Sequence, residues 1–199
     1  MNTLILATRN QGKLREIQQM LGDNIRVQTL DAFQDAPDVI EDGDTFEANA
    51  IKKAREIAQH TRLPALADDS GLVVDALNGA PGIYSARFAG ENATDADNNA
   101  KLLDLLSDVP ENQRTARFCC VMALVTPNGH TQTAKGTWEG RMLTAPRGDN
   151  GFGYDPLFFD PIQNCASAEL PSEEKNRHSH RGQALRAILP EIHDLFSSE

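Results

Sequence analysis

Two adjacent carboxylates, a hydroxyl and a glycine lie between two apolar runs in the segment Ala65–Asp75. Their order, Asp68-Asp69-Ser70-Gly71, predicts a buried strand that delivers charge to an exposed end, where the glycine lets the backbone turn tightly. Carboxylate oxygens bind hard cations, and a carboxylate beside a metal ion can also accept a proton from water. An acidic turn between two strands is the alternative that this segment leaves open when it is taken alone.

A second polar stretch, Thr8–Lys13, follows the apolar run 3–7 and precedes apolar residues at helical spacing. The pattern predicts a strand, a polar loop and a helix, with hydroxyl, amide and ammonium groups at the helix start. Free N–H groups and the positive end of the helix dipole favour an anion at such a place. The glycine patterns of the Walker loop and of dinucleotide-binding folds are absent from the stretch. A helix cap followed by a solvated lysine is the alternative.

Two further glycine-bearing stretches, Gly151–Asp155 and Ser179–Gly182, are expected where the chain changes direction, as are the two stretches above. Ligand sites in α/β proteins lie where loops leave strand ends. The chemistry gathered there comprises cations, carboxylates and one aromatic ring: Lys13, Lys175 and Arg181, Glu41 and Asp69, and Phe152. Such a set suits an anionic, magnesium-chelated molecule with a flat ring, which is a nucleoside triphosphate.

The elements that must position these residues alternate between strand and helix patterns. Strands are expected at 3–7 and 25–30, and Asp44-Thr45-Phe46-Glu47 has the spacing of a capping box before a helix. Residues 117–138 predict a hairpin around a Pro-Asn-Gly turn, and the polar residues 94–99 open another helix. The predicted class is α/β with a mixed sheet, in a single domain over residues 1–199.

The composition of the chain argues against several classes of protein. The chain has 199 residues, 40% of them hydrophobic, and a net charge of −10, which argues against a nucleic-acid binder. It lacks a signal-peptide pattern and any apolar run of the roughly 20 residues that cross a bilayer. Its three cysteines have no disulfide or metal-ligand spacing. We therefore expect a cytoplasmic protein that acts on a small molecule, with no membrane or nucleic-acid partner.

Six motifs, in order, resemble those of the Ham1 family of inosine and xanthosine triphosphate pyrophosphatases, and the resemblance covers essentially the whole chain. The motifs are Thr8–Lys13, Thr45–Ala50, Ala67–Gly71, Gly79–Arg87, Gly151–Asp155 and Ser179–Gly182. The resemblance implies the ITPase-like fold, in which a central mixed, twisted β-sheet is flanked by helices and two lobes surround a substrate cleft. It also implies Mg²⁺-dependent hydrolysis of ITP, dITP and XTP to the monophosphate and pyrophosphate, and a homodimer.

The resemblance assigns roles residue by residue. Asp69 matches the general base and a metal ligand, and Glu41 matches a second metal ligand, with Asp42 and Asp44 as neighbouring rivals. The positions that match substrate contacts are Thr8, Arg9, Asn10, Gln11, Gly12, Lys13, Lys53, Ser70, Phe152, Gly153, Tyr154, Asp155, Lys175, His180 and Arg181. Arg9 departs from the glycine often found at its position in the family, which bears on the local geometry of the loop.

These roles lead to a mechanistic hypothesis. Asp69 takes a proton from water, Asp68 orients Asp69 or helps to set its pKa, and Lys13 and Lys53 assist at the phosphates. Donors from His180 and Arg181, or nearby backbone N–H groups, form hydrogen bonds with the purine 6-oxygen. In ATP the 6-position carries an amino group, so these donors would face another donor. How GTP is excluded stays open.

Three other functions remain open in the sequence: a nucleotide sensor without catalysis, a pyrophosphatase for pyrimidine or methylated nucleotides, and a Ser–His–Asp hydrolase. The last would use Ser70, His180 and Asp155, but the G-x-S-x-G elbow is absent.

Overall fold

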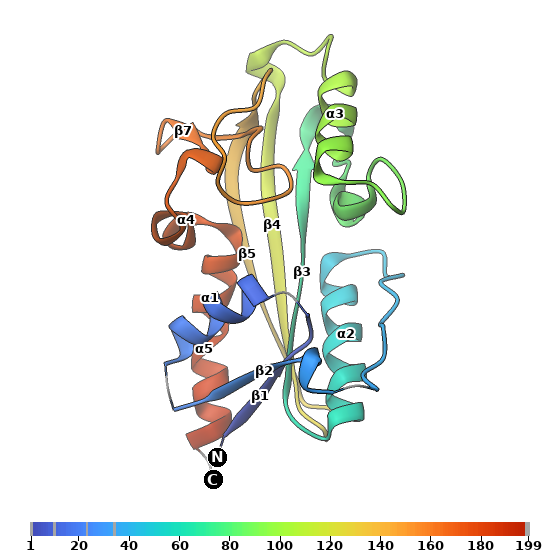
Figure 1. The fold of residues 1–199 in the computed structure, drawn as a ribbon, viewed down its shortest axis with the longest axis vertical. Helices are drawn as coiled ribbons and strands as arrows, with labels where there is room; N and C mark the ends of the chain where they lie inside the picture. Colours follow the sequence, from blue (N-terminus) through green and yellow to red (C-terminus); the bar gives the residue numbers. More distant parts are fainter. Residues whose placement is uncertain (1, 10, 23, 34, 198–199) are drawn as a thin grey trace. The chain divides into compact units, whose positions relative to one another are not determined.

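The computed structural model describes residues 2–9, 11–22, 24–33 and 35–197. Its strands are β1 (Thr3–Leu6), β2 (Arg26–Thr29), β3 (Ala65–Val74), β4 (Thr115–Val125), β5 (Thr131–Met142), β6 (Phe158–Asp160) and β7 (Cys165–Ala166). Its α-helices are α1 (Gln11–Leu21), α2 (Phe46–Thr61), α3 (Asp95–Leu105), α4 (Ser172–His178) and α5 (His180–Ser197) (Figure 1). Within these ranges the strands form one sheet in the order β2-β1-β3-β4-β5-β6-β7. β1 runs parallel to β2 and β3, whereas β6 is antiparallel to β5 and β7, so the predicted α/β class with a mixed sheet is confirmed.

The chain divides into two compact units. Unit 1 comprises Met1–Asp69, Cys120–Gly136 and Ala184–Glu199, and unit 2 comprises Ser70–Cys119 and Thr137–Gln183. The boundary falls between Asp69 and Ser70, consecutive residues of β3. The substrate cleft between two lobes and the single catalytic domain stay predictions.

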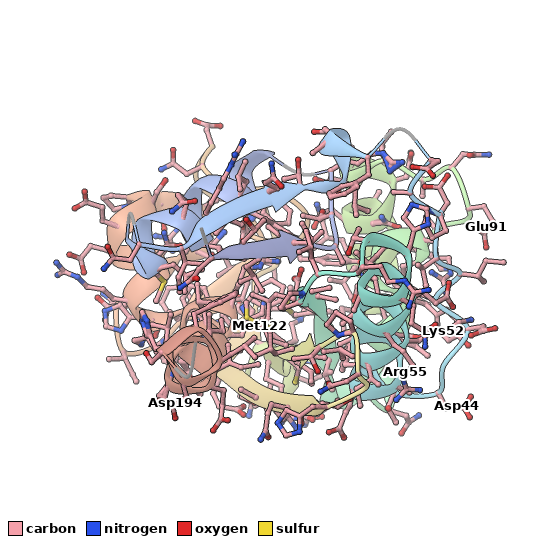
Figure 2. The ribbon with its side chains drawn as sticks, turned by 90° about the horizontal axis from the view of Figure 1, so that it is seen from below. Asp44, Lys52, Arg55, Glu91, Met122 and Asp194 are labelled. Atoms are coloured by element: carbon pink, nitrogen blue, oxygen red, sulfur yellow. The ribbon has the colours of Figure 1, made fainter. Side chains whose placement is uncertain are left out.

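In unit 1 the strands bury both faces, because successive side chains of a strand point to opposite sides of the sheet. Leu4 and Leu6 of β1 pack in one cluster with residues of α1 and α5, whereas Ile5 packs in a second cluster with residues of α2. In β3, Leu66 joins the first cluster and Ala67 the second. In Figure 1, α2 lies on one side of these strands and α1 and α5 on the other. Met122 lies among the core side chains in Figure 2. The same alternation sends the next two residues of β3, Asp68 and Asp69, toward different helices.

β3 corrects one expectation from the sequence. It is a continuous strand of 10 residues, so Asp68–Gly71 lies in its middle and not at a turn or an exposed end. Asp68 is 4% exposed and Asp69 is 8% exposed. The strand continues because neighbouring helices supply partners for the two carboxylates, and because the apolar residues Leu72 and Val74 are fully buried beyond them.

The start of α2 corrects a second expectation. The N-cap is Thr45 and not Asp44, and its hydroxyl accepts a hydrogen bond from the Ala48 amide at 3.0 Å. Glu47 does not close a capping box, since its carboxylate instead accepts a hydrogen bond from Thr133 at 3.0 Å. α2 ends at Thr61, before Arg62, which has a left-handed conformation (φ 58°).

Unit 2 has its own core of aromatic and aliphatic side chains, in which Phe118, Trp138 and Phe158 pack together. α3 begins with a complete capping box between Thr94 and Asp97, as the polar residues there predict. Within the described residues, every helix is too short or too polar to span a bilayer.

Candidate active site

The first feature of the site in unit 1 is an ion pair between a helix and the central strand. Nζ of Lys13, in the first turn of α1, lies 2.7 Å from Oδ1 and 2.8 Å from Oδ2 of Asp68. Asp68 faces α1 because it has the same parity in β3 as Leu66. The pair is only partly open to water, since the Lys13 side chain is 20% exposed. Lys13, which the sequence predicts to bind a phosphate group, is thus paired with a carboxylate of the protein itself.

Asp69 faces the opposite helix, α2. Nδ2 of Asn49 donates a hydrogen bond to Oδ2 of Asp69 at 3.0 Å. Burial raises the pKa of Asp69 to about 6; repulsion from Glu41 and Asp68 adds to the rise, whereas the Asn49 hydrogen bond and Lys53 oppose it. A carboxylate with a pKa this close to neutrality is suited to accept a proton from water.

Lys53, one turn along α2 from Asn49, joins the acidic loop to the strand. Its ammonium forms an ion pair with Glu41 and donates a hydrogen bond to the Asp68 carbonyl at 3.0 Å. Burial alone would lower the pKa of Lys53, but the carboxylates of Glu41, Asp68 and Asp69 outweigh burial and raise it. Lys53 therefore stays a cation within an acidic cluster.

The structure separates Glu41 from its two rivals. Asp42 pairs with Lys52 at 2.6 Å, and its side chain is 65% exposed. Figure 2 labels Asp44 in the loop before α2 and Lys52 on α2. Asp44 is exposed. Of the three acids, Glu41 is the one whose charge acts on Asp69.

Two further residues of the predicted phosphate loop, Thr8 and Arg9, have contacts with other segments of unit 1. The Leu30 amide donates a hydrogen bond to the carbonyl of Thr8 at 3.1 Å, and Arg9 lies 3.5 Å from the exposed Asp38. Asn10 lies outside the described residues. Gln11 and Gly12 begin α1, as the sequence predicts.

Unit 2 contains a cavity of about 150 Å³, and all of the substrate positions predicted in this unit line it. They are Ser70, Phe152, Gly153, Tyr154, Asp155, Lys175, His180 and Arg181. These residues come from β3, the glycine-rich loop before β6, α4 and the first turn of α5. The structure thus brings β3 together with three later segments of the chain.

Phe152 presents an aromatic face at this cavity. Its side chain is 53% exposed, and the cations of Lys175 and Arg181 lie 5.3 and 5.6 Å from its ring centroid. Arg181 also donates a hydrogen bond to the Ser70 hydroxyl at 3.3 Å. An exposed ring can stack with a purine, and the two cations beside it make the mouth of the cavity locally positive.

Asp155 organises the loop that carries Phe152. Its buried carboxylate accepts hydrogen bonds from the Phe152 amide at 2.9 Å and the Ser167 hydroxyl at 2.8 Å, and it forms an ion pair with Lys175. Gly151 has φ +81°, which favours glycine at this turn. The Tyr154 hydroxyl donates a hydrogen bond to the Ser85 carbonyl at 2.9 Å, and burial raises the pKa of this tyrosine.

Reasoning from the sequence missed Phe118 and Asn49 as parts of the site. Phe118 of β4 lies in the cavity wall and stacks on the buried His180 ring, with centroids 4.8 Å apart and planes 14° apart. It occurs in an apolar run that predicts only core. Asn49 lies within the motif Thr45–Ala50, but nothing in the sequence shows its contact with Asp69.

The cluster in unit 1 suits a magnesium ion that also binds phosphates. Among the side chains that the structure describes, no three of His, Cys, Asp and Glu are grouped to form a metal site by themselves. Mg²⁺ commonly takes one or two carboxylates and completes its coordination with water and phosphate oxygens. Glu41 and Asp69 could supply such oxygens. Burial raises the pKa of Asp69 and repulsion from Glu41 adds to the rise, so a dication placed there would favour the charged carboxylate.

Comparison with known proteins identifies the family of this chain. The model of the Ham1 family matches residues 4–191. The dITP/XTP pyrophosphatase of Geobacter sulfurreducens is 57% identical over 189 residues, which cover 94% of this chain and 95% of that protein. The dITP/XTP pyrophosphatase of Vibrio cholerae is 52% identical, with 98% of each chain covered. The solved structure of a HAM1 protein from Coxiella burnetii has a TM-score of 0.91 at 46% identity, covering 98% of this chain and 100% of that one. The chain therefore belongs to the Ham1 family.

Proposed function

We propose that the protein is a nucleoside triphosphate pyrophosphatase that hydrolyses the non-standard purine nucleotides ITP, dITP and XTP to the monophosphate and pyrophosphate. The observation that carries the proposal is the buried Asp69, held by Asn49 within a cluster that also contains Lys13 and Lys53. Relatives of 52–57% identity over nearly the full chain carry the name dITP/XTP pyrophosphatase, which supports the substrate class.

In this mechanism, the residues of unit 1 act on the triphosphate. Glu41 and Asp69 would hold Mg²⁺, which when bound neutralises charge on the phosphate oxygens. Lys13 and Lys53 add positive charge near the α and β phosphates. Asp69 accepts a proton from the water that hydrolyses the anhydride bond between these phosphates, so that this bond breaks and pyrophosphate leaves. Asp68 keeps Lys13 in place through both of its oxygens.

The residues of unit 2 act on the base. Phe152 offers a stacking face, and His180 and Arg181 offer donors to the purine 6-oxygen. An adenine amino group would leave such buried donors unpaired, at a cost of about 1–3 kcal/mol each, so ATP is rejected. A cytoplasmic location, a homodimer and the absence of nucleic-acid and membrane partners remain further predictions.

One assay tests the proposal. Purified protein with Mg²⁺ is offered ITP, XTP, dITP, GTP, ATP and dTTP, and orthophosphate is measured with and without added inorganic pyrophosphatase. Orthophosphate from the inosine and xanthosine nucleotides only when the helper enzyme is present is the expected result. Direct release of orthophosphate would mean a phosphatase, and binding of ITP without turnover would mean a sensor.

A further inference from the structure

Asn49 uses both ends of its amide side chain, and its two partners belong to different segments. Its Nδ2 donates to Oδ2 of Asp69 on β3 at 3.0 Å, and its Oδ1 accepts from the Gly43 amide at 2.7 Å. The residue is 1% exposed. A buried amide with both ends engaged holds its partners in a defined geometry, because breaking either bond would leave a buried polar group unsatisfied.

The loop that contains Gly43 lies so close to α2 that residue 43 has no room for a side chain. A Cβ at Gly43 would lie 2.8 Å from Oδ1 of Asn49 and 2.9 Å from Cβ of Ala48, closer than real Cβ atoms approach other atoms. The acidic loop therefore approaches α2 this closely because residue 43 is glycine. Two residues earlier, Glu41 pairs with Lys53 of the same helix.

We propose that Asn49 is a positioning residue that fixes Asp69 and the Glu41 loop relative to each other. One end of its side chain orients the carboxylate that accepts the proton, and the other end fastens the loop that supplies the second carboxylate. Both carboxylates are the proposed Mg²⁺ ligands, so Asn49 sets their spacing before metal and nucleotide arrive. This inference rests on the proposed function, and it assigns no contact between Asn49 and substrate.

The main rival explanation is that Asn49 only stabilises the first turns of α2. Thr45 provides the matched control, because its hydroxyl caps the same helix through Ala48 and the residue is exposed. Thr45→Ala weakens the start of α2 and leaves the hydrogen bonds of Asn49 to Asp69 and Gly43 in place. Loss of activity that comes only from a weakened helix would appear in both variants.

The experiment compares the parent chain, Asn49→Ala and Thr45→Ala by thermal unfolding, by kcat and KM for ITP, and by amide hydrogen exchange of metal-free protein. Replacing residues that orient metal ligands typically costs about 10–100-fold, so Asn49→Ala should lower kcat by that factor and change KM by less than about threefold. It should also speed exchange at the Gly43 amide. Thr45→Ala should lower the unfolding temperature and keep kcat within about twofold of the parent, because it leaves Asp69 in place.

Several results would overturn the proposal. The first is a kcat for Asn49→Ala within about threefold of the parent value. The second is a rate of amide exchange at Gly43 that is the same in Asn49→Ala and in the parent. The third is a loss of kcat in Thr45→Ala as large as that in Asn49→Ala. If Asn49→Ala does not fold, Gly43→Ala disturbs the same contact from the loop, and normal kcat in that variant counts against the proposal. A parent chain that hydrolyses none of the nucleotides overturns the proposed function, whereas an active parent with an unimpaired Asn49→Ala variant overturns only the role of Asn49.

Discussion

Lys13 of α1 contacts both carboxylate oxygens of Asp68 of β3, at 2.7 and 2.8 Å, across 55 positions of sequence. The pair is asymmetric, because the Asp68 side chain is 4% exposed and the Lys13 side chain is 20% exposed. Lys13 therefore neutralises a buried charge in addition to its proposed role at the phosphates. Stability and catalysis should depend on this lysine for different reasons.

We expect Lys13→Met to destabilise the fold and to lower activity. Removing one partner of a fully buried ion pair costs about 3–5 kcal/mol, and the partial exposure of Lys13 reduces the expected cost to about 2 kcal/mol. Loss of a cation at the phosphates should lower kcat/KM by about 100-fold. Urea unfolding and ITP turnover measure the two effects.

The double variant Lys13→Met/Asp68→Asn separates the two roles. Removing the Asp68 charge should restore most of the lost stability, because no unpaired carboxylate is then left buried. Activity should stay low, since the cation is still missing. If the double variant regained activity together with stability, Lys13 would have only a structural role.

Asp69→Asn should lower turnover by about 10²–10⁴-fold, the range of general-base assistance, and leave the fold intact. The amide oxygen can still accept the hydrogen bond that Asn49 donates in the parent. Circular dichroism and steady-state ITP hydrolysis check this result. Near-normal turnover would remove Asp69 from the role of base.

The same variant should be more stable than the parent in metal-free buffer at pH 8. The pKa of Asp69 is about 6 in the folded chain, above the value of about 3.9 in an unfolded chain. A raised folded pKa gives stability that is fully present below pH 4 and is lost as the pH rises through 6. Two pKa units correspond to about 2.7 kcal/mol, and screening by water reduces the expected difference to about 1–2 kcal/mol.

Urea unfolding in EDTA at pH 8 and at pH 4 tests this difference between Asp69→Asn and the parent. Asparagine does not titrate, so the advantage of the variant should be present at pH 8 and absent at pH 4. A variant that is less stable than the parent at pH 8 would contradict the electrostatic strain assigned to Asp69.

The sequence predicted the elements well where a local pattern carries the signal. The continuous apolar run at residues 3–7 predicted β1, and the polar residues from Thr94 predicted the start of α3. Eight residues that line the cavity of unit 2 were named in advance as substrate positions, because their motifs resemble those of a known family in a fixed order; their role toward substrate stays a prediction.

The failures have a common physical origin in tertiary contacts. Asp68-Asp69-Ser70-Gly71 resembles a turn in isolation, and it stays extended because Lys13 and Asn49 approach it from distant helices. At the start of α2, Thr45 caps the helix through the Ala48 amide, whereas Glu47 accepts a hydrogen bond from Thr133 of β5 and closes no capping box. The sequence around Asp68, Asp69 and Glu47 contains none of these three partners.

Two conservative variants distinguish Glu41 from Asp42 as the second proposed Mg²⁺ ligand. Glu41→Gln should raise the Mg²⁺ concentration for half-maximal ITP hydrolysis by at least about 10-fold, because it removes a proposed carboxylate ligand. Asp42→Asn should change that concentration by less than about twofold, since Asp42 pairs with Lys52 at the surface. Titrations of Mg²⁺ at saturating ITP measure both. The opposite order would assign the second ligand to Asp42.

Phe152→Ala should weaken substrate binding and leave both the chemical step and the fold nearly unchanged. Base–aromatic stacking contributes about 1–3 kcal/mol, so KM for ITP should rise by about 5- to 150-fold with kcat within about threefold. Stability should change little, because the Phe152 side chain is 53% exposed. Ile162→Ala is the matched control: Ile162 is 87% exposed in the same unit and does not line the cavity. Equal KM values for the parent and Phe152→Ala would exclude stacking, and a fall in kcat alone would place Phe152 in the alignment of the phosphates.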